Sequence, residues 1–132
     1  MSNQRKTRIE DYLLAVELLC RDTDRATTGK VAAMIGVANG TASSFLRTLA
    51  ESGLVDLQPY AGSTLTEAGR RRLLVVMRRR QVLELFLVQT LHLSIESASE
   101  EAWQLEPAAS NHLIDCIDSQ LGNPIVARWS PM

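Results

Sequence analysis

The chain of 132 residues lacks the features that direct a protein into a membrane or through a secretion system. Its longest apolar runs, such as residues 73–77, are far shorter than the roughly 20 residues that a membrane-spanning helix needs. The first six residues contain no apolar signal segment. We therefore expect a cytoplasmic protein with no membrane partner.

Signatures of catalysis and of metal binding are also scarce. Cys20 and Cys116 lie far apart and lack the spacing of a metal knuckle or redox motif, so we interpret both as small buried apolar residues. We interpret His92 and His112 as ordinary histidines without a neighbouring ligand. No nucleophile–base pair, phosphate-binding glycine loop or HExxH pattern occurs, which predicts that the chain is not an enzyme.

Positive charge is nearly absent from the last third of the chain. Residues 81–132 hold one Lys or Arg against seven Asp and Glu, whereas residues 1–80 hold thirteen against eight, a balance of +5. DNA binding draws on phosphate neutralisation, so we expect the basic part to be the part that faces nucleic acid. The length and the 45% hydrophobic content fit one compact domain or two small ones.

Residues 26–51 predict two helices joined by a tight turn. Thr27 and Thr28 can cap the first helix, and Gly36 ends it. The second opens at Asn39 and spaces its apolar residues by three and four positions, as in a half-buried helix. The other face of this helix presents Thr41, Ser43, Ser44, Arg47 and Thr48. These polar groups suit contacts with base edges and phosphates in a major groove.

Residues 54–69 predict a short hairpin and a new helix. Residues 54–57 alternate like a strand, a turn follows at Pro59, and residues 63–65 return, with residues 60–63 as the tip. Thr66 can cap the helix that begins at Glu67. This order predicts a mainly α fold with a small β wing, a winged helix-turn-helix. The alternative is a helical hairpin and ribbon that touch no DNA.

The second half predicts a long helix over residues 67–91 and two further helices. We expect the long helix to pack along Leu73, Leu74, Met77, Leu83, Phe86, Leu87 and Thr90. Its arginine clusters, residues 70–72 and 78–80, either contact the DNA backbone or solvate the helix. After a loop at residues 92–97, we expect one helix to start near Ser99. Another should run from about Pro107 to Leu121, with Pro107 as either a break or the first turn.

These patterns predict two domains, a winged helix-turn-helix over residues 1–72 and a helical dimerisation domain over residues 73–132. The apolar helices exceed what the small wing domain can cover, which favours packing against a second copy. A dimer also suits palindromic DNA.

The chain resembles the diphtheria toxin repressor and manganese transport regulator (DtxR/MntR) family of metal-dependent repressors. The matching segments are residues 9–13, 31–32, 35–37, 49, 52–55, 65–69, 79–87, 101–102, 106, 110 and 122–125. The more specific ones, in combination, are the Glu-Asp-Tyr start at residues 10–12, the Glu-Ala helix opening and the Gly-Asn-Pro-Ile close at residues 122–125. The resemblance implies a homodimer whose winged helices enter successive major grooves of a double-stranded operator.

The resemblance also implies which residues touch DNA. The residues expected on the DNA-reading helix are Asn39, Gly40, Thr41, Ser43, Ser44 and Arg47. Those expected to contact the DNA backbone are Thr27, Thr28 and Tyr60.

The family binds Mn(II) or Fe(II), and here most of the corresponding positions differ. Leu14, Arg80, Trp103 and Pro107 stand where the family places metal ligands, and only Asp11, Glu84 and Glu106 remain able to coordinate. Three carboxylates favour hard ions with little selectivity for Mn or Fe. Since a guanidinium stays protonated and has no lone pair to donate, we predict that a salt bridge from Arg80 to Glu84, Glu106 or Asp11 replaces the metal.

The sequence thus predicts a homodimeric repressor of the DtxR/MntR type with weakened or lost metal dependence. One alternative is a regulator switched by a small molecule or by oxidation of Cys20 or Cys116. Another is a winged-helix protein-interaction module that no longer binds DNA, because Asn39 and Gly40 give the recognition face little reach.

Overall fold

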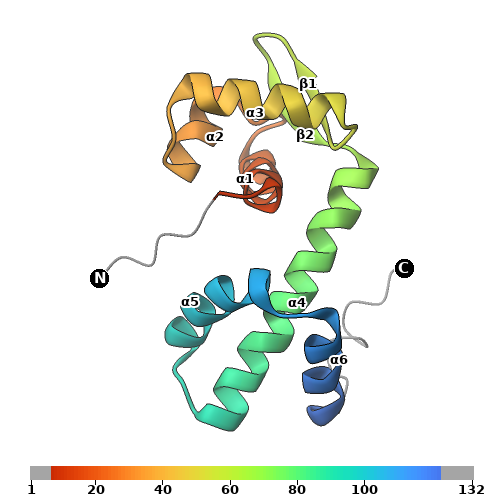
Figure 1. Ribbon diagram of the computed structural model, residues 1–132. Helices are drawn as coiled ribbons and strands as arrows, with labels where there is room; N and C mark the ends of the chain where they lie inside the picture. The colour runs from red at the N-terminus through yellow and green to blue at the C-terminus, as the bar shows by residue number, and fades with distance from the viewer. Residues whose placement is uncertain (1–6, 123–132) are drawn as a thin grey trace. The chain divides into compact units, whose positions relative to one another are not determined.

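The computed structural model describes residues 7–122, which divide into two compact units (Figure 1). The N-terminal unit extends to Leu74, and the C-terminal unit begins at Val75 within a single long helix. The Asn123 to Ile125 part of the expected family motif lies outside the described residues. Within residues 7–122, no helix is both long and apolar enough to cross a membrane.

The N-terminal unit is built on three helices: α1 (Ile9–Asp22), α2 (Thr28–Ile35) and α3 (Asn39–Glu51). Its fully buried side chains include Leu13, Val31 and Leu46, one from each helix. Tyr12 of α1 stacks on Phe45 of α3 with ring centroids 4.2 Å apart and planes 6° from parallel. Burial of these apolar faces holds the helix-turn-helix together.

The predicted boundaries of α2 and α3 are confirmed. The Thr27 side chain caps α2 by accepting the Lys30 amide at 3.4 Å. Gly36 ends α2 with a φ of 88°, a left-handed conformation that favours glycine. The chain then turns within two residues and enters α3 at Asn39. The winged helix-turn-helix is therefore present as predicted.

The wing consists of the antiparallel strands β1 (Val55–Gln58) and β2 (Gly62–Leu65). Gln58 pairs with Gly62, so the turn is limited to residues 59–61. The prediction that Ser63 belongs to the tip is wrong. Ser63 lies in β2 opposite Leu57 and is fully buried, because it also pairs with the chain segment that leads into α2.

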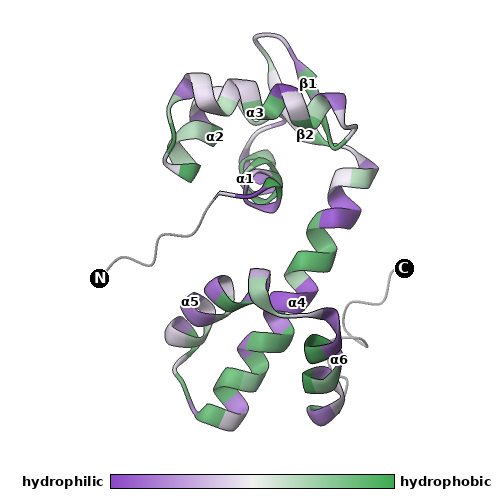
Figure 2. Ribbon diagram, viewed as in Figure 1, coloured by the Kyte–Doolittle hydropathy of each residue, from purple (hydrophilic) through white to green (hydrophobic). Residues whose placement is uncertain are grey.

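Helix α4 (Glu67–Leu91) begins and ends near the expected residues. The Thr66 hydroxyl caps it by accepting the Gly69 amide at 3.1 Å. The expected inner face is partly wrong, because Leu74 is 44% exposed whereas Val76 and Arg79 are buried. Figure 2 shows hydrophobic and hydrophilic residues alternating along α4.

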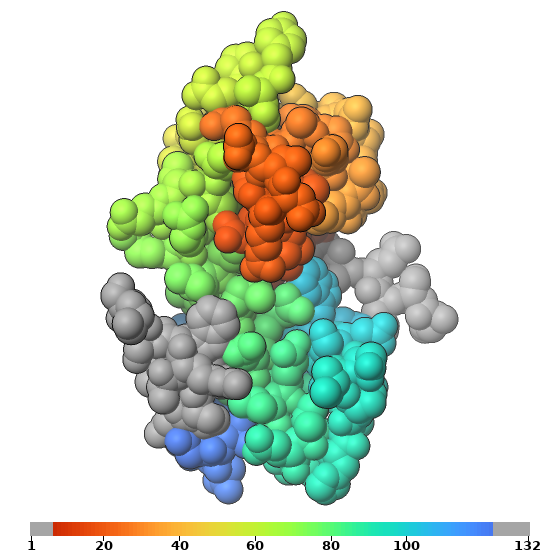
Figure 3. All heavy atoms as spheres, turned by 180° about the vertical axis from the view of Figure 1, so that it is seen from behind, coloured from red at the N-terminus to blue at the C-terminus, as the bar shows by residue number. Residues whose placement is uncertain are grey.

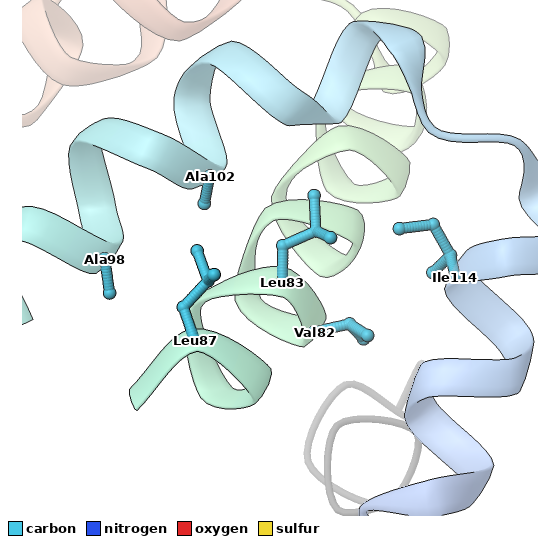
Figure 4. Close-up of a cluster of buried hydrophobic side chains, with 6 residues drawn as sticks. All are labelled: Val82, Leu83, Leu87, Ala98, Ala102 and Ile114. Atoms are coloured by element: carbon cyan, nitrogen blue, oxygen red, sulfur yellow. The ribbon is translucent and has the colours of Figure 1, made fainter. Parts of the chain in front are cut away.

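In the C-terminal unit, α5 (Ile95–Leu105) and α6 (Asn111–Gln120) pack against α4. Figure 4 shows Val82, Leu83 and Leu87 of α4 directed toward small residues of α5 and toward Ile114 of α6. The small residues, Ala98 and Ala102, are one helical turn apart and let the helices approach closely.

Two predicted boundaries in this unit are wrong. Helix α5 starts at Ile95, not near Ser99, because Ser94 caps it by accepting the Ser97 amide at 3.1 Å. Pro107 does not open the last helix. It lies in the short 3₁₀ helix η1 (Glu106–Ala108), and Ser110 caps α6 instead.

Candidate nucleic-acid interface

The exposed face of α3 carries most of the residues expected to read DNA. The opposite face is buried through Ala42, Leu46 and Leu49. The exposed residues are Asn39, Gly40, Thr41, Ser44 and Arg47, and Ser43 is half-buried. This face offers hydroxyls, an amide and one guanidinium, the groups that bond to base edges and phosphates.

The N-terminus of α2 lies beside this face. Thr27 is exposed and Thr28 is half-buried, and the exposed Lys30 follows in the first turn. Helix N-termini attract anions because their first amides lack helical acceptors and the helix dipole is positive there. The position therefore suits a DNA phosphate.

The wing ends in a protruding aromatic residue. Tyr60 occupies the middle of the turn, is fully exposed and has a φ of 64°. In the space-filling view of Figure 3 the wing projects from the rest of the N-terminal unit. An exposed aromatic residue at a projecting turn can reach a ligand that the helices alone would not contact.

A cleft of about 520 Å³ separates α3 from the wing. Among the expected DNA-contacting residues, Thr27, Thr28, Ser43, Arg47 and Tyr60 line it. The walls are completed by Leu57, Gln58, Pro59 and Gly62, which sequence reasoning did not single out. Asn39, Gly40, Thr41 and Ser44 do not line this cleft, so they form a separate part of the surface.

The unit boundary changes the charge division expected from the sequence. Residues 6–74, which form the N-terminal unit, hold nine Lys and Arg against eight Asp and Glu, a balance of only +1, while residues 75–132 hold four against seven, a balance of −3. The expected excess shrinks because Arg78, Arg79 and Arg80 belong to the C-terminal unit. Attraction to DNA must therefore come from local cations such as Lys30 and Arg47.

Arg78 and Arg79 pair with acidic side chains of their own C-terminal unit. This differs from both alternatives considered from the sequence, contact with the DNA backbone and solvation of the helix. Arg78 lies 3.1 Å from Asp118 and 3.5 Å from Asp115, both on α6. Arg79 is 8% exposed and binds Glu106. These arginines therefore hold α6 and η1 against α4.

Arg79 makes a buried network in the C-terminal unit. Its Nε donates to the Glu106 carboxylate at 2.9 Å, and its Nη2 donates to the Glu106 carbonyl at 2.8 Å. Further donor groups bind the Asn111 side chain at 2.5 Å and the Ala109 carbonyl. Glu106 is itself 3% exposed. A buried carboxylate is thus compensated by a guanidinium that uses its fork of donors.

Arg80 has different surroundings from its neighbour. Its guanidinium lies 4.2 Å from the centroid of the Trp103 ring, and its Nη2 lies 4.0 Å from the Glu84 carboxylate. Arg80 thus lies at long range from Glu84, and Glu106 forms a close ion pair with Arg79. The sequence contained a signal for this, since Arg79 follows Val76 by three positions and precedes Leu83 by four.

The carboxylates that remain at the family's metal positions do not fit a Mn(II) or Fe(II) centre. Glu106 is engaged by Arg79, and the Asp11 carboxylate accepts the Arg8 amide at 2.8 Å at the start of α1. Over residues 7–122, no three His, Cys, Asp or Glu side chains are grouped so that they could hold a metal ion. A guanidinium beside Glu84 supplies positive charge where a dication would need donors.

The two thiols differ in their surroundings. Cys20 is half-buried, its Sγ lies 3.5 Å from the Ser63 carbonyl, and burial raises the pKa of the thiol. Cys116 is exposed, so the expectation of a buried apolar residue is wrong for it. Its Sγ lies 3.7 Å from His112 Nε2, one turn earlier on α6, a neighbour that the sequence analysis overlooked.

Sequence comparison assigns both halves of the chain. Residues 6–63 match the family described as "Iron dependent repressor, N-terminal DNA binding domain". Residues 66–128 match "Iron dependent repressor, metal binding and dimerisation domain". The chain belongs to the DtxR/MntR family of iron-dependent repressors.

Family members from bacteria and archaea are similar to this chain over most of its length. The transcriptional regulator MntR of Escherichia coli O6:H1 is 32% identical over 84% of this chain and 71% of its own. The uncharacterized HTH-type transcriptional regulator MJ0568 of Methanocaldococcus jannaschii is 32% identical over 81% of this chain and 86% of its own.

Two solved structures with this fold come from longer chains. A manganese-dependent transcriptional repressor in complex with manganese has a TM-score of 0.77 and 40% identity, covering 89% of this chain and 54% of that one. T. acidophilum IdeR, with a TM-score of 0.79 and 20% identity, shows the likeness of fold; the match covers 90% of this chain and 56% of IdeR. The chain thus spans little more than half of either protein.

Membership in the DtxR/MntR family confirms three predictions. The fold is mainly helical with a two-strand wing, and the chain is a DNA-binding transcriptional regulator, not an enzyme. The two matched domains imply DNA and a second copy of the chain as partners.

Proposed function

We propose that this DtxR/MntR-family protein is a cytoplasmic homodimeric repressor that binds double-stranded operator DNA without requiring Mn(II) or Fe(II). The observation that carries the metal independence is the buried Arg79–Glu106 pair. A carboxylate held by a guanidinium at 2.9 Å is a poor metal ligand, because coordination would leave the buried arginine without its counterion.

The N-terminal unit supplies the DNA contacts in this proposal. Helix α3 enters the major groove with Arg47 and the exposed polar residues around it. Thr27 and Thr28 contact a phosphate at the N-terminus of α2, and Tyr60 contacts the backbone from the wing. The cleft between α3 and the wing then receives one DNA strand.

A second copy covers an apolar groove of the C-terminal unit. The groove is about 370 Å³ in volume and contains Leu83, Phe86 and Leu87 of α4 with Leu113 of α6. Leu105 and Leu113 are 43% and 47% exposed in the single chain. Apolar surface of this kind, in a domain of the dimerisation type, supports a homodimer.

The deciding experiment measures binding to duplex DNA from upstream of the protein's own gene, first in chelator and then with Mn(II) or Fe(II). We expect binding in chelator, unchanged by either metal and weakened steeply by salt. Binding that requires metal would contradict metal independence. Binding of one Mn(II) per subunit at micromolar concentration, lost in Asp11→Ala, would also contradict it.

The exposed thiol favours a second candidate, a regulator switched by oxidation. Cys116 is exposed beside His112, whereas burial raises the pKa of Cys20 and keeps it protonated. In this case peroxide would change DNA affinity in the wild type and not in Cys116→Ser, with Cys20→Ser as the matched control. Failure to bind any duplex at low salt would instead favour the protein-interaction module.

A further inference from the structure

The segment that leads into α2 is joined to the wing by an isolated β-bridge between Ala26 and Ser63. Ala26 and Ser63 exchange two backbone hydrogen bonds, each 2.8 Å long. Gly62 has a φ of 101°, and a Cβ there would collide with the Ala26 carbonyl. This close approach connects the wing directly to the residue that precedes Thr27.

Arg25 strengthens this connection by binding both wing strands at once. Its Nε and Nη2 donate to the Gly62 carbonyl of β2 at 3.2 and 3.1 Å. The same Nη2 donates to the Asp56 carbonyl of β1 at 2.7 Å and lies 3.4 Å from the Asp56 carboxylate. One guanidinium therefore ties the α2 entry segment to both strands of the wing.

We propose that Arg25 is a positioning residue for DNA binding, which sets the distance between the wing and the N-terminus of α2. The inference rests on the proposed DNA contacts of Thr27 and Tyr60, which both line the cleft. Arg25 precedes Thr27 by two residues, and its carbonyl partners Asp56 and Gly62 lie on the two strands that carry the Tyr60 turn. Its effect on DNA passes through the wing.

The chemistry of arginine explains why this residue type suits the position. A planar guanidinium presents several donors in fixed directions, so it can bind two carbonyls on different strands together. An ammonium group is a point charge on a flexible stem and cannot reproduce this geometry. The Asp56 carboxylate offsets the charge of Arg25. Arg25 is therefore less suited to bind a DNA phosphate directly.

A double-mutant cycle on the full-length protein tests the proposal. We expect Arg25→Ala to weaken binding to the upstream duplex by about five- to tenfold, and to add almost nothing in a Tyr60→Ala background. Arg25→Lys should recover little of the loss. The matched cycle uses Arg47→Ala, whose effect on affinity should add to that of Arg25→Ala because Arg47 acts from α3.

Hydrogen exchange provides a readout that does not depend on DNA. Arg25→Ala should speed exchange of the wing amides, Ser63 among them, and leave those of α1 and α3 unchanged. Unchanged wing exchange, or effects of Arg25→Ala and Tyr60→Ala that simply add, would overturn the inference. If the wild type bound no duplex, the proposed function would fail, and exchange would still decide whether Arg25 positions the wing.

Discussion

The two units use the same residue type in opposite ways. In the N-terminal unit Arg47 is exposed at the cleft, whereas in the C-terminal unit Arg79 is 8% exposed and surrounded by acceptors. An exposed cation costs little desolvation and remains available to a partner, while a buried one must be fully paired. Arg47 therefore stays available for recognition, whereas Arg79 serves the internal structure of the C-terminal unit.

The pairing of arginines in the C-terminal unit also shows which side chains can stand in place of the metal ligands in a family member. Arg80 stacks on Trp103, and Arg79 binds Glu106. Large side chains and an ion pair are therefore present at or beside the positions where the family has metal ligands. The proposed DNA contacts all belong to the N-terminal unit and involve neither Arg79 nor Arg80. Each of the following substitutions tests one side of this comparison.

The largest effect is expected at the buried pair. Glu106→Ala leaves the Arg79 guanidinium without its counterion, and we expect it to reduce the free energy of unfolding by about 3–5 kcal/mol. Urea unfolding followed by circular dichroism measures this loss. Glu101→Ala, on an exposed position of α5, is the matched control and should change stability by less than about 0.5 kcal/mol. Equal effects of the two substitutions would show that the buried network carries no stability.

Substitution of the exposed Arg47 should lower DNA affinity and leave the stability of the fold nearly unchanged. Arg47→Ala should weaken DNA affinity by about ten- to a hundredfold, because charge-assisted contacts to bases or phosphates are lost. Its free energy of unfolding should stay within about 0.5 kcal/mol of the wild type. Arg21→Ala, an exposed charge at the end of α1, is the control for net charge. Equal losses of affinity in both variants would indicate a nonspecific effect of charge.

The smallest effect concerns pH and the attachment of α1 to α4. Burial alone would raise the pKa of Glu10, but its backbone hydrogen bond and the Arg72 guanidinium, at 2.9 Å, outweigh burial and lower it below 4.5. The folded state therefore gains stability from ionised Glu10 above this pH and loses it as the pH falls further.

Glu10→Gln tests this contribution. Comparing the free energies of unfolding at pH 7 and pH 3, we expect the variant to show a smaller decrease than the wild type, by less than about 1 kcal/mol because Arg72 is largely solvent-exposed. An identical decrease in both proteins would mean that the Glu10–Arg72 pair contributes nothing measurable to acid sensitivity.

Local sequence signals predicted most of the N-terminal unit. Thr27, Gly36 and Thr66 mark helix ends through capping and left-handed backbone conformations, which depend on neighbouring residues alone. The predicted start of α5 near Ser99 was wrong because Ser94 and Ser99 are both acceptable caps. The choice between them depends on packing Ala98 and Ala102 against α4, a contact between segments distant in sequence.

By itself the sequence determined the winged helix-turn-helix, the long α4 and the family, because caps, apolar spacing and motifs are local properties. Only the tertiary structure decided that Arg79 binds Glu106, that Ser63 is buried and that Arg25 joins both wing strands. Adjacent arginines on a helix point about 100° apart, so which one is buried depends on what packs against each face. The partners of Arg79 and Arg25 lie 27 or more residues away and become neighbours only on folding.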